Sequence, residues 1–200
     1  MGIELALVVS GASGGRLAVA FARAALACPG LDRLHVVVTP PAEQVLAHEL
    51  GPEWAPAERF VERLGGGDRA VAWANSDLMA PIASGSHRLG GVIILPCSAG
   101  MAGSLAHGIS RGLGQRVADV ALKQRWPLVI GIREAPMSVI LLENLLTLAR
   151  AGAFVVPPVP AFYADPGASG LERFVAHHCL RLLDLVGLEG PEEEGLRWRP

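Results

Sequence analysis

The hydrophobic positions of the chain fall into short runs separated by small or polar turn residues. Six runs have the length and apolar character of buried strands: residues 5–9, 34–38, 70–73, 91–95, 128–132 and 154–156. Segments with helical periodicity lie between and after them, at residues 16–28, 42–50, 58–64, 115–125, 139–151 and 170–186. Because strands alternate with helices, the pattern predicts an α/β fold with a doubly wound, mostly parallel sheet covered by helices on both faces.

The first apolar run continues directly into a glycine-rich turn, Ser10–Gly15, which is followed by an alanine-rich helix. Free amides at a helix N-terminus point outward, and the helix dipole favours an anion there. The dinucleotide fingerprint G-x-G-x-x-G is absent because position 12 is Ala12, and the P-loop of nucleotide triphosphatases is absent too. The turn is therefore either one wall of a phosphate site or a tight connection that binds nothing.

Four predicted strands end in small, hydroxyl-bearing or charged residues, at positions 10–15, 39–41, 96–100 and 133–136. In doubly wound sheets the ligand lies at the carboxyl ends of the strands. The sequence therefore predicts a functional crevice at this edge.

Charged residues near these strand ends are candidates for the chemistry. Arg116, Lys123, Arg133 and Arg181 would form an anion site if they converged, although each one alone reads as a solvated surface charge. The pattern of residues 42–50 favours a solvent-facing Glu49, which could also face the site from the end of its helix.

Glu143 stands in the apolar segment 139–151, which carries hydrophobic residues on more than one side and is predicted to be mostly buried. A buried carboxylate must be paired or must have a raised pKa. Two interpretations stay open: a structural ion pair with an arginine, or a general acid or base. Tyr163, the only tyrosine, is either a donor to a phosphate or a packed aromatic ring.

Composition adds the expected organisation. The 200 residues are 51% hydrophobic and 18% charged, which suits one domain over residues 1–186 with an extended tail at 187–200, and which indicates buried subunit contacts. A net charge of −2 gives no electrostatic case for nucleic acid, and no apolar run is long enough to span a membrane. Three widely spaced cysteines and the absence of metal-ligand spacing predict a cytoplasmic protein without a metal.

Eight short motifs occur along the chain: GASG at 11–14, ASGS at 83–86, PCS at 96–98, RVADVALK at 116–123, REAP at 133–136, LLEN at 141–144, PPVPAFY at 157–163 and RW at 197–198. In this order they resemble the UbiX-type flavin prenyltransferases, within the homo-oligomeric flavin-containing cysteine decarboxylase-like proteins. The resemblance implies a Rossmann-like fold, and it covers almost the whole chain.

The resemblance also implies an activity. Such proteins bind FMN and transfer a dimethylallyl group from dimethylallyl phosphate to N5 and C6 of the reduced flavin. The prenylated FMN serves UbiD-type decarboxylases. The family assembles as trimers that pair into dodecamers, with FMN usually at a subunit interface, which agrees with the apolar composition.

Carried over by motif, the resemblance assigns three sets of residues. The FMN-binding set is Gly11, Ala12, Ser13, Thr39, Ser98, Ala99, Gly100, Met101 and Arg116. The set that grips dimethylallyl phosphate is Lys123, Arg133, Tyr163 and Arg181. The catalytic set is Glu143, Ser13 and Glu49, with Glu143 favoured as the group that protonates the departing phosphate or relays a proton.

The chain departs from the family pattern at four positions. Met101 stands where the family has a threonine, Pro40 where it has a lysine, Leu78 where an aromatic residue is common and His107 where a threonine is usual. Two alternatives to prenyl transfer therefore stay open: an FMN-binding paralogue with reductase or decarboxylase activity, or a non-catalytic flavin-binding protein.

Overall fold

The computed structural model describes residues 2–160 and 170–190. Its centre is a six-stranded sheet in the order β3-β2-β1-β4-β5-β6, and every neighbouring pair of strands is parallel. This arrangement confirms the predicted doubly wound fold, and all six predicted strands are present. The strands are β1 (Ile3–Val9), β2 (Leu31–Val38), β3 (Ala70–Ala74), β4 (Gly91–Cys97), β5 (Leu128–Ile132) and β6 (Phe154–Val155).

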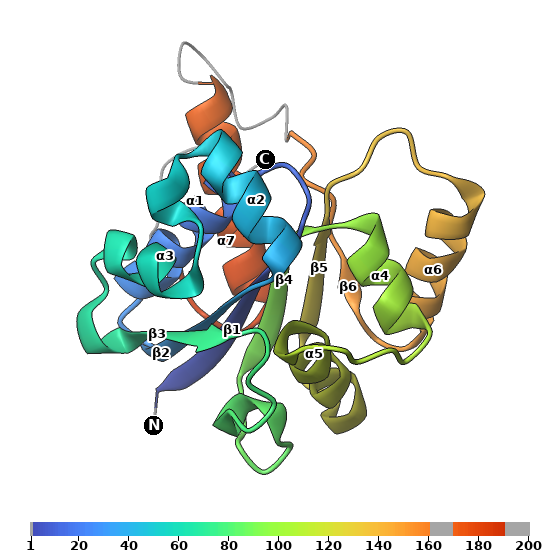
Figure 1. The fold of residues 1–200 in the computed structure, drawn as a ribbon, viewed down its shortest axis with the longest axis horizontal. Helices are drawn as coiled ribbons and strands as arrows, with labels where there is room; N and C mark the ends of the chain where they lie inside the picture. The colour runs from blue at the N-terminus through green and yellow to red at the C-terminus, as the bar shows by residue number, and fades with distance from the viewer. Residues whose placement is uncertain (1, 161–169, 191–200) are drawn as a thin grey trace, which may run out of the picture.

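Helices cover both faces of the sheet (Figure 1). The helices are α1 (Gly15–Ala27), α2 (Pro40–Glu49), α3 (Ala57–Leu64), α4 (Ala99–Ala106), α5 (Leu113–Gln124), α6 (Val139–Arg150) and α7 (Gly170–Leu185). One apolar layer joins the sheet to α1, α2, α3 and α7, and the other joins it to α4, α5 and α6.

Strand β1 belongs to both layers. Leu5, Leu7 and Val9 pack into the first layer, and Ala6 and Val8 pack into the second, all at most 1% exposed. A strand buried on both faces has no polar alternation, which is why the run 5–9 is continuously apolar. The edge between β1 and β4 is the point at which the strand order reverses, where a crevice is expected.

Helix α4 was not predicted from the sequence. Its residues AGMAGSLA are small and give weak periodicity, so the apolar pattern alone did not mark a helix. Ser98 is its N-cap, because the Ser98 hydroxyl accepts a hydrogen bond from the Met101 amide at 3.2 Å. The helix points its first turn at the crevice.

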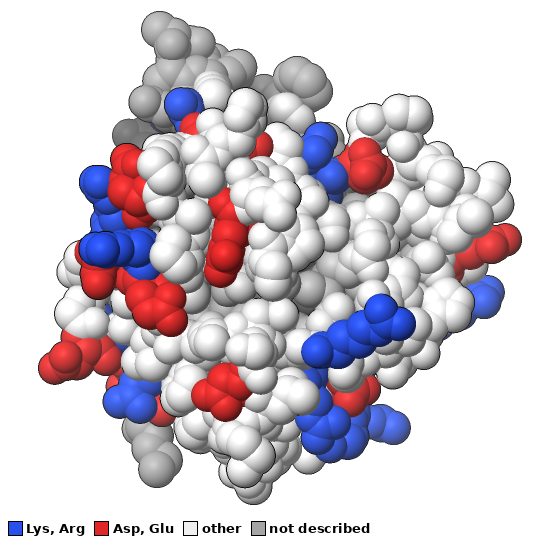
Figure 2. All heavy atoms as spheres, in the orientation of Figure 1, with Lys and Arg blue, Asp and Glu red and all other residues white. Residues whose placement is uncertain are grey.

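The prediction that residues 139–151 are mostly buried is wrong for the single chain. Helix α6 lies beside α4, outward from the edge of the sheet (Figure 1), and packs chiefly on α4 and also on β6. Its inner face is a narrow stripe of Leu141, Leu145 and Leu148. Its other large apolar side chains face away from the molecule: Val139, Ile140, Leu142 and Leu146 are 70%, 72%, 51% and 50% exposed. Figure 2 shows that the surface from α2 across α4 to α6 is largely free of charged side chains.

No helix in residues 2–160 and 170–190 is long and apolar enough to cross a membrane. At the C-terminal end, Leu188 is buried in the first layer at 2% exposure, so packing continues past residue 186. Residues 191–200 of the predicted tail lie outside the described residues. The division into a domain and a tail stays a prediction.

Candidate functional site

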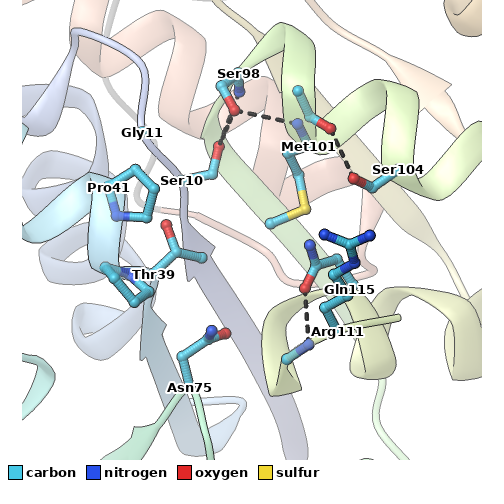
Figure 3. A pocket seen from close by; sticks show the side chains of 13 residues that line it. Ser10, Gly11, Thr39, Pro41, Asn75, Ser98, Met101, Ser104, Arg111 and Gln115 are labelled. Carbon is cyan, nitrogen blue, oxygen red and sulfur yellow. Dashed lines mark hydrogen bonds between the residues drawn. The ribbon is translucent and has the colours of Figure 1, made fainter. Parts of the chain in front are cut away.

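A cavity of about 280 Å³ lies at the carboxyl ends of β1, β2 and β4, between α2, α4 and α5 (Figure 3). It coincides with the reversal of strand order. The sequence predicted five of its lining residues: Gly11, Thr39, Ser98, Gly100 and Met101. The remaining lining residues are Ser10, Pro40, Pro41, Asn75, Ser104, Arg111, Gly112 and Gln115.

The backbone of the glycine turn lies close to helix α2. A Cβ atom on Gly11 would lie 2.5 Å from Cβ of Pro41, and Gly14 adopts φ 122°, which side chains rarely tolerate. Ala12 is buried, and its amide donates to the Ser10 carbonyl at 2.7 Å. These contacts within the protein are enough to explain why the residues of the turn are small, even where no ligand touches them.

The N-terminus of α1, which the sequence marked as a candidate phosphate site, holds a carboxylate of the protein itself. Glu49, from the end of α2, accepts hydrogen bonds from the Gly14 amide at 3.1 Å and the Gly15 amide at 2.8 Å. Burial alone would raise the pKa of Glu49, but the Ser13 hydroxyl, these two amides and the charge of Arg133 lower it below its ordinary value. The favoured interpretation of Glu49 as a solvent-facing side chain is therefore wrong.

Glu49→Gln is expected to lower the free energy of unfolding by about 1–2 kcal/mol at pH 7, because an amide loses the charge that the α1 amides and dipole stabilise. A carboxylate whose pKa is lowered by folding stabilises the protein above its unfolded pKa, near 4.5, and loses that contribution as the pH falls further. Urea unfolding at pH 7 and pH 3.5 checks this. A deficit in Glu49→Gln that stays constant between the two pH values would contradict it.

Helix α4 is the one that presents free amides to the cavity. The first-turn amides of α5 are used, because Asn75 accepts from Leu113 at 2.7 Å and from Gly114 at 3.1 Å. Helix α2 begins with Pro40 and Pro41, which have no N–H. The amides of Ala99 and Gly100 begin α4 and have no intrahelical acceptor. An anion in this cavity therefore meets α4 first.

Thr39 adds an unused hydroxyl. Its side chain lines the cavity, the residue is only 6% exposed, and Oγ1 has no hydrogen-bond partner among the described residues. A buried hydroxyl without a partner costs free energy, so the site is arranged for a polar ligand atom. By contrast, Ser10 and Ser98 are tied to each other, with the Ser98 amide donating to Ser10 Oγ at 2.8 Å.

The residues fit the FMN that the family resemblance implies. The α4 amides and the Thr39 hydroxyl suit a phosphate or ribityl oxygen, and the Met101 side chain extends into the cavity as an apolar surface for a ring (Figure 3). The neighbouring Cys97 thiol is fully buried, and burial raises its pKa to about 12, so it is no nucleophile at neutral pH.

Beyond the cavity, the structure brings Ser13, Glu49 and Arg133 together. The Arg133 Nε donates to the Ser13 carbonyl at 3.0 Å, and the Ser13 hydroxyl bonds Glu49. All three belong to the sets assigned from the motifs. They form a cluster of one hydroxyl, one carboxylate and one cation at the edge where the crevice lies.

The other assigned cations occupy different places in the single chain. Lys123 is near the amino end of β5 and Arg133 follows its carboxyl end, so the length of the strand, roughly 16 Å, separates them. The Arg116 Nε donates to the Ala83 carbonyl at 3.1 Å, and Arg116 does not line the cavity. Arg181 is exposed on α7. Tyr163 lies outside the described residues.

Glu143 is not the buried carboxylate that the sequence predicted. It is exposed on α6, and among the described residues it forms no ion pair. The reason is the packing of α6 on α4, which leaves this side of the helix outside the single chain. Its assignment as the proton donor stays a prediction, while Glu49 is the assigned carboxylate that lies within the cluster.

The sequence of this chain was then compared with known proteins. The model of the flavoprotein family matches residues 3–176, which is most of the chain. The chain belongs to the flavoprotein family. The flavin prenyltransferase UbiX of Deinococcus radiodurans is 40% identical over 198 residues, covering 98% of this chain and 93% of that protein.

Solved structures agree with the family assignment. AnUbiX (PadA1), in complex with FMN and dimethylallyl pyrophosphate, has a TM-score of 0.84 at 32% identity and covers 100% of this flavoprotein and 99% of its own chain. A dodecameric FMN-dependent UbiX-like decarboxylase from Escherichia coli O157:H7 has a TM-score of 0.85 at 35% identity, with 99% and 100% covered. The predicted recognition of UbiX-type proteins is confirmed.

Three cavity residues of the flavoprotein, Asn75, Arg111 and Gln115, were not predicted from the sequence. Asn75 and Gln115 cap the start of α5. The Asn75 side chain accepts a hydrogen bond from the Gly114 amide, and the Gln115 side chain accepts one from the Gly112 amide at 3.0 Å. Arg111 is the charged residue among those that line the cavity. The available signal was the pair of glycines around it, Gly108 and Gly112, which marks a turn between two helices.

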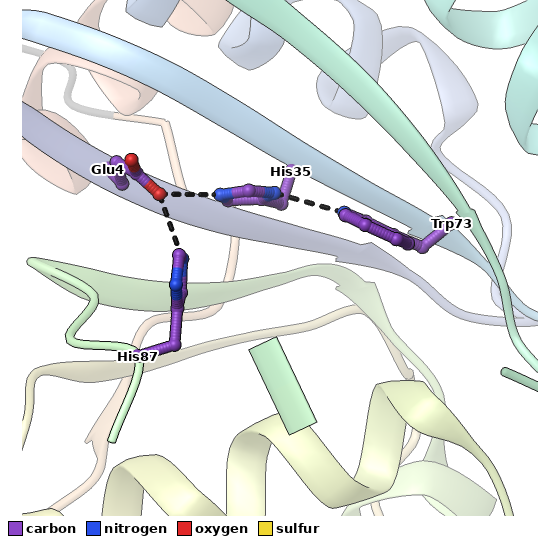
Figure 4. Close-up of polar contacts among 4 residues, drawn as sticks. All are labelled: Glu4, His35, Trp73 and His87. Atoms are coloured by element: carbon purple, nitrogen blue, oxygen red, sulfur yellow. Dashed lines mark hydrogen bonds and ion pairs between the residues drawn. The ribbon is translucent and has the colours of Figure 1, made fainter. Parts of the chain in front are cut away.

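The flavoprotein also carries a polar cluster away from the crevice, formed by Glu4, His35, Trp73 and His87 (Figure 4). Glu4 Oε2 lies 2.8 Å from His35 Nε2 and 2.9 Å from His87 Nε2, close enough for the three side chains to share a metal ion. However, Trp73 Nε1 donates to His35 Nδ1 at 3.0 Å. Since Nδ1 accepts, the hydrogen of neutral His35 is on Nε2, and that nitrogen donates to Glu4 instead of ligating a metal.

Trp73→Phe is expected to lower the free energy of unfolding by about 1 kcal/mol at pH 8, because the His35–Trp73 hydrogen bond is lost. Burial lowers the pKa of His35 in the folded protein, so His35 costs stability as the pH falls below its unfolded value of 6.5. Without Trp73, Nδ1 of His35 is free to take a proton in the folded protein, which reduces this loss of stability in acid. The stability difference between Trp73→Phe and the wild type should therefore be smaller at pH 5.5 than at pH 8. Urea unfolding at both pH values measures it, and a deficit that grows in acid would contradict the hydrogen-bond pattern.

Proposed function

We propose that this flavoprotein is a flavin prenyltransferase that binds FMN and uses dimethylallyl phosphate. The observation that carries the proposal is that two features lie next to each other. One is the cavity at the start of α4, whose free amides suit a phosphate, and the other is the cluster of Ser13, Glu49 and Arg133. The glycine turn connects them, because Gly11 lines the cavity and Ser13 follows two positions later. The likeness to UbiX proteins over nearly the whole chain supports it.

In the proposed reaction, the C–O bond of dimethylallyl phosphate breaks and bonds form from the two ends of the allyl unit to N5 and C6 of the reduced flavin. The N5 proton leaves with the phosphate as hydrogen phosphate, and the proton lost from C6 is balanced by protonation of the middle carbon of the former prenyl double bond. Reduced FMN supplies those two flavin atoms. Arg133 offsets the negative charge of the departing phosphate, since a guanidinium can bind two phosphate oxygens at once. Beside it, the Ser13 hydroxyl donates a hydrogen bond to the ionised Glu49 carboxylate, which is the assigned group placed to accept a proton.

We further propose that the active assembly is a homo-oligomer built from trimers, as in a dodecamer. The apolar outer face of α6 and the separation of Lys123 from Arg133 support it, because a neighbouring copy would cover the first and could supply the second cation. The cavity of one chain, about 280 Å³, is also slightly below the roughly 300–1,000 Å³ typical of complete ligand pockets. Three free, buried cysteines support a reducing cytoplasm.

The test is anaerobic incubation with reduced FMN and dimethylallyl phosphate, followed by mass spectrometry of the flavin. A flavin heavier by one prenyl unit is expected, and a parallel incubation with dimethylallyl diphosphate identifies the preferred donor. An unchanged flavin, under conditions in which a UbiX enzyme modifies it, would reject the proposal. Addition of the product to an apo UbiD-type decarboxylase tests the proposed recipient.

A second candidate, an FMN-dependent reductase or decarboxylase, is favoured by one observation. Met101 places a thioether in the cavity where the family has a threonine hydroxyl. Bound FMN that cycles with an electron donor and does not respond to prenyl phosphates would support this candidate.

A further inference from the structure

The cavity of this chain has lost polar groups that the family pattern supplies. Met101 removes a hydroxyl and Pro40 removes an amine, and both residues line the cavity. A phosphate dianion in this space still needs positive charge, since α4 amides alone carry only part of an elementary charge. The question is which side chain supplies it.

Arg111 is the charged residue on the cavity wall. It precedes α5 on the turn from α4, and in Figure 3 it lies on the side where Ser104 of α4 and Gln115 of α5 face each other. None of the described ion pairs includes Arg111, and no carboxylate is among the lining residues. Arg116, which the motif analysis assigned to FMN, instead bonds the Ala83 carbonyl and Asp119.

Two further observations show that the same cavity is built for a polar ligand. Thr39, which is 6% exposed, lines the cavity and its buried hydroxyl has no partner among the described residues. The first amides of α4 begin at the same wall. Hydroxyl, amides and guanidinium together make the donor set that a phosphomonoester requires.

We infer that Arg111 binds the phosphate of FMN in this protein and replaces the cation and the hydroxyl lost at Pro40 and Met101. The inference rests on the proposed function and deepens it. The phosphate of the prenyl donor is the other source of the same chemistry. The position of Arg133 beside Ser13, outside the lining of this cavity, favours FMN as the phosphate that Arg111 meets.

The test compares FMN with riboflavin, which lacks the phosphate, by titration of flavin fluorescence against the apoprotein. Arg111→Gln is expected to weaken FMN binding about 10- to 30-fold and riboflavin binding by less than about 2-fold. Arg111→Lys should lose less, because it keeps the charge without the bidentate geometry. Arg88→Gln, an exposed arginine on the loop before β4, is the matched control and should change neither affinity.

The FMN-to-riboflavin ratio decides the outcome. Equal weakening of both flavins in Arg111→Gln, or no weakening of FMN, would overturn the inference. A raised KM for dimethylallyl phosphate at saturating FMN, with FMN affinity intact, would assign Arg111 to the donor and would also overturn it. If Arg111→Gln does not fold, the ratio measured for Arg111→Lys decides. Failure of the wild-type protein to bind FMN would instead reject the proposed function.

Discussion

Ile140→Glu is expected to break the proposed homo-oligomer into monomers of 20.9 kDa and to reduce the proposed prenyl transfer by at least about 100-fold. Ile140 is 72% exposed on the outer face of α6, beside Val139, Leu142 and Leu146. A charge on this face costs little in a free chain, but several kcal/mol once a second copy covers it. Light scattering coupled to size exclusion measures the mass.

The loss of activity follows from the separation of the cations. If Lys123 must come from a neighbouring copy to meet Arg133, a monomer lacks one of the cations that bind the donor phosphate, even though its own fold is intact. Leu171→Glu is the matched control, because Leu171 is 65% exposed but lies on α7, in the opposite layer. It should leave both mass and activity unchanged. An Ile140→Glu protein that stays fully assembled would show that α6 is not the interface.

Thr39→Val is expected to change stability and cofactor binding in opposite directions. The isosteric valine removes a buried hydroxyl that has no partner among the described residues, so the apoprotein should keep or gain up to about 1 kcal/mol of stability. FMN should bind about 10- to 30-fold more weakly, since the ligand loses a donor in a site with little water. Thermal unfolding of the apoprotein and FMN titration measure the two effects.

Thr39→Ser provides the control, because it keeps the hydroxyl and removes only a methyl group. Its FMN affinity should stay close to that of the wild type. A Thr39→Val apoprotein that loses more than about 1 kcal/mol would mean that the hydroxyl already has a structural partner. An unchanged FMN affinity would mean that the cofactor does not reach this wall.

The fold was predictable because the central strands β1, β4 and β5 are buried on both faces, and β2 is buried over Leu34–Val38. Continuous apolar runs such as Leu5–Val9 need no tertiary information to be recognised, and the alternation of strands with helices sets the class of fold. Helix α4 was not predictable in this way, because its glycines, alanines and serine give no apolar stripe. Its identity depends on the Ser98 cap and on packing against α6.

The site was predictable only in part, for a similar reason. Gly11, Thr39 and Ser98 follow strands and therefore gather at one edge of the sheet. The contact between Glu49 and the α1 amides joins residues 34 and 35 positions apart, and no local pattern reports it. Glu143 shows the converse error, because an apolar helix can keep its hydrophobic outer face for another chain.

The Glu49 carboxylate gives the crevice a polarity along its length. One end, at the start of α1, already carries a negative charge, while the other end, at the start of α4, offers free amides and Arg111. In the proposed site, a flavin phosphate would therefore find free amides at the start of α4, whereas the amides at the start of α1 are already occupied by Glu49. With the phosphate at that end, the flavin ring of the proposed cofactor would lie toward Ser13 and Arg133, so the occupied α1 amides would favour one orientation of the ligand.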